Sequence, residues 1–396
     1  MSDDASDLLR LQLDALEQDV GRFAGALAAA PVGGRLGVRF EALLQSLRHD
    51  LATLERQQAA GGVPAALWSE LRLLAADLAR FSAEYLRCLQ GERLRAAEVD
   101  GGFLAVCDAL LAGVAWRSDL PLDRDAAVGD GESYAGLTDV VGVRFPAFDV
   151  WSLPVALHEL GHSVAVRSRD PRPRGGFEDD FAGLAAEHRE GLRRSLDGKV
   201  DPPALERLLT EAGHHLHEQF ADLFALYTGG PAFACTCVLL RFDPGAAYEA
   251  SSGHPSDAQR TAVLLALLPE IDESYAALAA RLSATWGSAV AAAGLEAPPQ
   301  DGFERQVATG RRVLELLRRN LPARAGYDGW ARAFGLAGEL VSKTALGAVA
   351  TAGVRMEDVI NAAWLARLRS EKDVRRLERR AFELARRVAG GEQGER

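Results

Sequence analysis

The chain has 396 residues, of which 48% are hydrophobic and 26% charged, as is typical of a globular protein with at least one large core. Its net charge of −11 disfavours a protein that coats nucleic acid or anionic lipid, because both are polyanions. No apolar run approaches the roughly 20 residues of a transmembrane helix, and the first residues are acidic, unlike a secretory signal. We therefore expect a cytoplasmic protein with no nucleic-acid and no membrane partner.

Residues 1–100 are predicted to form a bundle of three helices. Apolar residues recur in three segments at alternating spacings of four and three, beginning with Leu9, Leu13 and Leu16. This spacing is typical of packed helices, and two turns rich in Pro and Gly separate the segments. Short turns favour an antiparallel intramolecular bundle. A coiled-coil surface for a protein partner or for self-association is the alternative.

Residues 101–262 differ from the bundle because they contain a strand signal. Residues 137–145 are rich in β-branched side chains and predict a strand. A helix is expected to follow, with Ser152 as its N-cap and its end near Arg167. A second helix is expected over residues 203–227, before a Gly-Gly-Pro sequence. The whole chain is therefore predicted to be mainly α with a small β element.

Residues 263–396 are predicted to be a C-terminal helical region. Apolar spacing typical of helices extends through most of this region. The predicted helical segments are 258–293, 303–321, 330–346 and 356–388. The arginines between residues 367 and 387 alternate with acidic residues, which favours a solvated helix face over a nucleic-acid surface.

The sequence His-Glu-Leu-Gly-His begins at His158, inside the first of the two helices in the middle region. Residues four apart on a helix share a face, so His158 and His162 lie about 6 Å apart and can bind one Zn²⁺. Glu159 is rotated by about 100° from His158. It is therefore expected to reach a water on the open side of the metal, as in HExxH zinc sites.

A third zinc ligand is expected from the second helix, where Glu218 and Asp222 share a face. A catalytic zinc site needs three protein ligands and one open position. We expect Glu218 to bind the metal and Asp222 to accept a hydrogen bond from the far nitrogen of His158. His214 in place of Glu218, a second metal, and two solvent-facing acids are the alternatives.

This arrangement resembles the gluzincin metallopeptidases, the class that includes thermolysin. The resemblance rests on the short HELGH motif and on the later Glu with Asp four residues on, and it covers about a third of the chain. It implies a zincin-like core in residues 101–262 and a bound Zn²⁺. It further implies that His158, His162 and Glu218 bind the metal, that Glu159 activates water, and that Asp222 supports a zinc-bound histidine.

A further segment is similar to the His-Pro segment of some gluzincin families, including the CaaX-type metallopeptidases. It begins at His254 and carries Arg260 six residues later. The resemblance implies that His254 and Arg260 help to hold the oxyanion and the scaffold of the active site. The alternative is an ordinary helix start capped by Ser256 or by the next residue. Tyr227 and Tyr248 are weaker candidates for the same role.

The expected activity is zinc-dependent hydrolysis of a peptide or protein substrate. Zinc activates water, Glu159 carries its proton to the leaving amine, and His254 donates to the oxyanion. Residues 139–143 are expected to form an edge strand that pairs with an extended peptide. Two alternatives stay open: a catalytically silent helical interaction protein on a zinc-peptidase fold, and zinc hydrolysis of a substrate other than a peptide.

Overall fold

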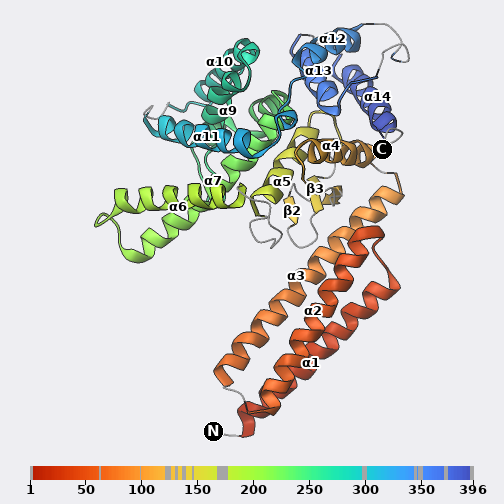
Figure 1. Cartoon of the computed structure of the whole chain (residues 1–396), viewed down its shortest axis with the longest axis vertical. Helices are drawn as coiled ribbons and strands as arrows, with labels where there is room; N and C mark the ends of the chain where they lie inside the picture. The colour runs from red at the N-terminus through yellow and green to blue at the C-terminus, as the bar shows by residue number, and fades with distance from the viewer. Residues whose placement is uncertain are drawn as a thin grey trace. The chain divides into compact units, whose positions relative to one another are not determined.

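Figure 1 shows the computed structural model of the chain. The structure describes residues 3–61, 64–98, 100–120, 126–129, 133–135, 140–144, 147–166, 177–296, 301–342, 346, 351–369 and 373–392. Helices dominate these residues and a sheet of three short strands accompanies them, which confirms the predicted fold class at this level. None of the described helices combines the length and the apolarity that crossing a membrane requires.

Contacts divide the chain into two compact units. One unit holds the first three helices together with β1 and β3, and the other holds α4 and every element from α5 onward. The helices of residues 263–396 thus share a unit with the predicted zinc-binding helices. The predicted division into an N-terminal bundle (1–100), a zincin-like core (101–262) and a C-terminal helical region (263–396) stays a prediction.

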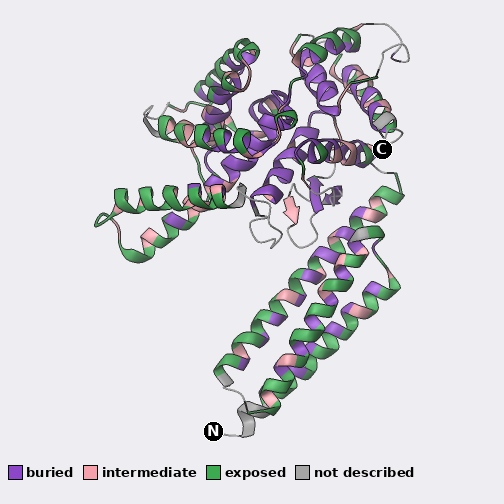
Figure 2. Cartoon of the chain, viewed as in Figure 1, coloured by how far each residue is buried: buried purple, intermediate pink, exposed green. Residues whose placement is uncertain are grey.

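The first unit contains three long helices, α1 (Asp3–Ala29), α2 (Gly34–Ala59) and α3 (Pro64–Ala96). They lie side by side, and each reverses the direction of the one before it (Figure 1). The apolar residues with alternating spacing, such as Leu9 and Leu13, are buried in one shared core. Figure 2 shows this core as a buried stripe along each helix, with exposed residues on the outer faces.

Tyr85 of α3 contacts the C-terminal end of α1 within this bundle. Its hydroxyl donates towards the carbonyl oxygens of Ala26 and Ala30, at 2.9 and 2.6 Å. Its ring meets Phe23 and Phe40 edge to face. A buried phenol needs such a partner, because an unsatisfied hydroxyl in an apolar core is costly.

The sheet consists of β1 (Ala126–Gly129), β2 (Ser133–Ala135) and β3 (Val140–Arg144), in the order β1-β3-β2. β3 is the described part of the strand predicted over residues 137–145, and the rest of that range lies outside the described residues. The expectation of an edge strand over residues 139–143 is wrong for its described residues, 140–143. β3 is the middle strand, so its backbone groups pair on both sides and offer no free edge to a peptide.

The second unit is helical apart from its share of the sheet. Its α-helices are α4 (Phe103–Arg117), α5 (Leu153–Val166), α6 (Phe177–Leu196), α7 (Pro202–Gly229), α8 (Ala232–Thr236), α9 (Asp257–Ile271), α10 (Ala276–Ala292), α11 (Asp301–Asn320), α12 (Trp330–Val341), α13 (Met356–Arg369) and α14 (Val374–Glu392). α5 packs along α7, and α6, α9 and α11 pack on other faces of α7. α4 and α6 were not predicted. α4 has little periodicity because it is buried on most sides, and α6 has no buried residue after Leu184, only exposed and half-buried ones.

Aspartate side chains accept backbone N–H groups at or just before the starts of the two helices that carry the predicted site. α5 begins directly after Ser152, whose N–H donates to Oδ1 of Asp149 at 2.8 Å. α7 begins after Asp201, which accepts from the N–H of Ala204 at 2.7 Å. Such caps satisfy N–H groups that the first turn leaves unpaired. Asp201, which was not predicted, thus caps the first turn of α7, whereas the role of Ser152 as the N-cap of α5 stays a prediction.

Candidate metal centre

The two histidines of the HELGH sequence lie one turn apart on α5 and face the same side. The Nε2 atoms of His158 and His162 are 3.1 Å apart. The side chain of His158 is 8% exposed and that of His162 is 20% exposed. The ring of Phe233 stacks on His158 with a centroid distance of 5.9 Å. Phe233 thus covers one face of the His158 ring, and solvent reaches the pair at His162.

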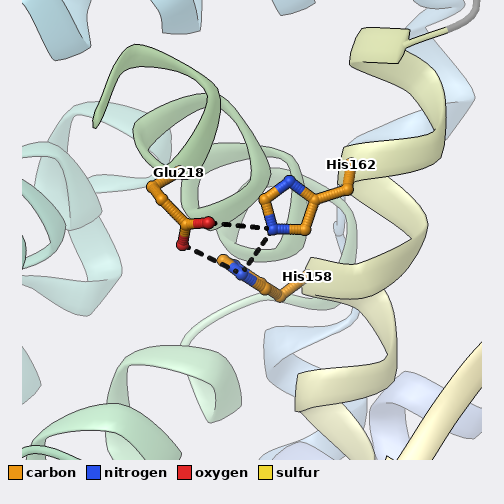
Figure 3. A group of neighbouring side chains, drawn as sticks. All are labelled: His158, His162 and Glu218. Carbon is orange, nitrogen blue, oxygen red and sulfur yellow. Dashed lines mark hydrogen bonds and ion pairs between the residues drawn. The ribbon is translucent and has the colours of Figure 1, made fainter. Parts of the chain in front are cut away.

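Glu218 of α7 brings a carboxylate to these histidines (Figure 3). Its Oε2 lies 3.5 Å from Nε2 of His158, and its Oε1 lies 3.3 Å from Nε2 of His162. One donor atom from each side chain falls within 4.8 Å of the other two. Within the described part of the chain, no other set of three His, Cys, Asp or Glu residues meets this condition. The structure thus brings together the three predicted ligands.

The spacing of the donor atoms fits a tetrahedral zinc site. Bonds of about 2.1 Å place neighbouring ligand atoms of a tetrahedron roughly 3.4 Å apart, and the measured separations are 3.1, 3.3 and 3.5 Å. Oε2 of Glu218 is buried and forms no hydrogen bond with a described residue, although it makes ion-pair contacts with Nε2 of His158 at 3.5 Å and with Nη2 of Arg260 at 3.9 Å. A buried polar atom of this kind normally has a closer partner. Two imidazoles and one carboxylate are also a ligand set that Zn²⁺ accepts.

Asp222 lies where the sequence predicts it, one turn beyond Glu218. Its Oδ1 is 2.9 Å from Nδ1 of His158, the nitrogen that faces away from the other donors. Burial alone would lower the pKa of His158, but contacts with Asp222 and Glu218 raise the pKa to about 10. Burial would raise the pKa of Glu218, whereas His158 and His162 hold the pKa well below its usual range. The two carboxylates therefore make this a strongly cation-attracting position.

Arg260 of α9 forms a two-pronged contact with Asp222. Nε and Nη2 of Arg260 donate to the two carboxylate oxygens at 2.9 and 2.7 Å, the geometry of the strongest charge-assisted pairs. Phe242 packs under the guanidinium, 5.0 Å from its ring centroid. Burial would raise the pKa of Asp222, but Arg260 and His158 lower the pKa. Arg260 thus orients the carboxylate behind His158, and its predicted contact with an oxyanion stays a prediction.

His254 lies beside the metal centre, at the outer side of Glu218. Its Nε2 is 3.5 Å from Oε1 of Glu218, and its side chain is 59% exposed. The following residues also form the helix start that the alternative interpretation expected, because Ser256 and Gln259 make a reciprocal capping box on α9. The structure therefore shows the helix start that the alternative interpretation expected, with His254 close to Glu218. The catalytic role of His254 stays a prediction.

Glu159 is buried on α5 next to the first histidine. Its negative charge contributes to the raised pKa of His158. The spacing rule places it on a different side of the helix from the two ligands. The role of Glu159 in activating water stays a prediction.

The weaker candidates lie elsewhere. His214 does not join the three donors, and its Nδ1 lies 3.1 Å from the carbonyl oxygen of Ser252. Tyr227 is buried, and its carbonyl oxygen accepts from the N–H of Tyr327 at 2.9 Å. Tyr248 lines an apolar cavity of about 720 Å³ between α9 and α10. The proposal that His214 replaces Glu218 therefore has no geometric support.

Gly161, which sequence reasoning did not single out, allows α5 to approach α7. A Cβ at this position would lie 2.8 Å from Cα of Ala221 and 3.2 Å from Cβ of Phe224. The close approach brings the histidines of one helix to the carboxylate of the other. An isolated Gly inside an apolar helix is the signal that could have revealed it.

We expect Gly161→Ala to lower the free energy of unfolding by about 1–2 kcal/mol, because backbone overlap outweighs the gain in helix propensity. Urea denaturation measures this loss. Gly213→Ala on α7 is the matched control, since a Cβ there meets nothing within 4 Å. That control should be stabilising by roughly 0.5–1 kcal/mol. Equal effects of the two substitutions would show that α5 and α7 are not in close contact at Gly161.

Comparisons with protein-family models, with characterised proteins and with solved structures found no match for this chain. The resemblance to gluzincins therefore depends on the HELGH spacing and on the cluster of His158, His162 and Glu218. That cluster alone does not assign the chain to a family.

Proposed function

We propose that the chain is a zinc-dependent hydrolase that cleaves peptide bonds. The observation that carries the proposal is the convergence of two imidazole nitrogens and a carboxylate from separate helices, at separations that suit tetrahedral zinc. The side chain of His162 reaches solvent, so the centre has an accessible side. A closed structural site would have a fourth protein ligand there.

His158, His162 and Glu218 would hold the metal. When bound, zinc supplies Lewis acidity that makes water nucleophilic near neutral pH and polarises a carbonyl group. The carboxylate of Glu159 takes a proton from the attacking water and later delivers it to the leaving amine. Nε2 of His254 is available to donate to the oxygen that gains negative charge.

Asp222 and Arg260 serve the same reaction by orientation. Oδ1 of Asp222 lies 2.9 Å from Nδ1 of His158, and this contact would keep Nε2 of that histidine directed at the other two donors. Arg260 holds both oxygens of Asp222, so the carboxylate cannot rotate away. Loss of a supporting partner of this kind typically lowers metal affinity by about 10–100-fold.

Zinc content and hydrolysis test the proposal together. The purified chain should hold one zinc ion by elemental analysis and should cleave denatured casein or a peptide library. A chelator should abolish cleavage, and added zinc should restore it. Zinc without hydrolysis of any peptide would favour the catalytically silent interaction protein, and absence of zinc binding would overturn the proposal altogether.

A further inference from the structure

The loop between Ala247 and Ala258 carries His254 to the metal centre. Its base is closed by a hydrogen bond from the N–H of Ala258 to the carbonyl oxygen of Ala247, at 2.8 Å. Its tip is a turn in which the N–H of Ser251 donates to the carbonyl oxygen of His254 at 3.0 Å. The N–H of His254 donates back to Oγ of Ser251 at 2.9 Å. The loop is thus compact, with a defined tip.

Two adjacent histidines of α7 contact this tip. Nδ1 of His214 lies 3.1 Å from the carbonyl oxygen of Ser252, and Nε2 of His215 lies 2.8 Å from the carbonyl oxygen of Ser251. A carbonyl oxygen only accepts, so each of these ring nitrogens must carry a hydrogen. The contacts therefore define one tautomer for each neutral imidazole.

The position of His254 depends on this tip more than on packing of its own side chain. Its imidazole is 59% exposed, yet Nε2 stays 3.5 Å from Oε1 of Glu218. Ser251 and Ser252 are exposed as well, and exposed loops with few packed side chains open readily. His214 lies one turn before Glu218 on the same helix. α7 thus carries both the proposed ligand Glu218 and the two histidines that contact the loop of His254.

We propose that His214 and His215 are positioning residues that hold the 251–254 tip so that His254 faces the metal centre. The proposal rests on the proposed hydrolase function for its catalytic consequence, but the anchoring itself is independent of that function. It gives His214 a role other than metal binding, consistent with its absence from the described cluster of three donors.

The test compares variants that remove, keep or shift the donor nitrogens. His214→Ala with His215→Ala removes both donors. His214→Asn with His215→Gln keeps an amide N–H near the positions of Nδ1 and Nε2. His214→Gln with His215→Asn is the matched control. It has the same composition, but its longer and shorter side chains are swapped, so that neither amide nitrogen lies at the position of the imidazole nitrogen it replaces. Each pair is also combined with His254→Ala.

Hydrogen exchange of the peptide that contains residues 251–256 is the first measurement. We expect faster exchange in the double alanine variant and in the control with His214→Gln and His215→Asn. The variant with His214→Asn and His215→Gln should exchange at a nearly normal rate. Unchanged exchange in the double alanine variant overturns the proposal, whether or not the chain hydrolyses peptides. Zinc content should stay the same in all variants, and loss of zinc would instead identify His214 or His215 as a ligand.

Peptide hydrolysis is the second measurement. Loss of two hydrogen bonds should lower kcat by roughly tenfold in the double alanine variant, with KM little changed. The same substitutions should change kcat by less than about twofold when His254 is already alanine, because the anchors act through that residue. Additive losses would show that the histidines act by another route and would overturn the positioning role.

Discussion

Replacing Glu159 by Gln should leave the metal in place and lower kcat by roughly 100- to 10,000-fold, the usual range for loss of a general base. Gln has nearly the same shape as Glu but accepts no proton at neutral pH. The three ligand side chains are untouched, so zinc content should equal that of the unmodified chain. Elemental analysis and peptide hydrolysis on the same preparation separate the two effects.

Glu211→Gln is the control for this substitution, since it makes the same chemical change on α7, about two turns before Glu218. It should retain full activity and full zinc content. Hydrolysis by the Glu159→Gln variant at the unmodified rate would refute the assignment of Glu159 as general base. Loss of zinc in that variant would instead show that Glu159 supports the ligands, which its buried position beside His158 makes a meaningful alternative.

Much of the helical architecture was predictable because burial leaves a period in the sequence. Leu9, Leu13 and Leu16 recur every three to four residues and all enter one core. α4 was missed for the opposite reason. Its apolar residues surround the helix because it is buried on most sides, so no polar face marks the period.

The order of strands was not predictable from the same information. Residues of β3 are apolar and β-branched, which indicates a strand but not its neighbours. Pairing on both sides depends on where β1 and β2 are placed by the rest of the fold. The expectation of an edge strand for peptide binding failed at this step.

The candidate metal centre was predictable where its geometry is local to one helix. The pair His158 and His162 follows from helical spacing alone, and Asp222 follows from Glu218 by the same rule. The partner of Arg260 does not follow from any such rule, because Asp222 lies on another helix. The contacts of His215 with the loop are equally non-local.

His162→Ala is expected to remove most of the zinc from the purified chain. Two protein donors would remain where a zinc site of this kind uses three, so the loss of affinity should exceed the 10–100-fold that a missing supporting hydrogen bond costs. His162 is a better target than His158. His158 contacts Asp222, and its removal would leave a buried carboxylate with one partner fewer.

His49→Ala on the exposed surface of α2 is the control, since it makes the same substitution in the other unit, at a residue that is not part of the described donor cluster. It should keep one zinc ion per chain after dialysis, while His162→Ala should keep almost none. Circular dichroism should show the same helix content in both variants, because the side chain of His162 is partly exposed and contributes little to the core. A His162→Ala variant that binds zinc as tightly as the unmodified chain would place the metal elsewhere, and the proposed chemistry of Glu159 would lose its basis.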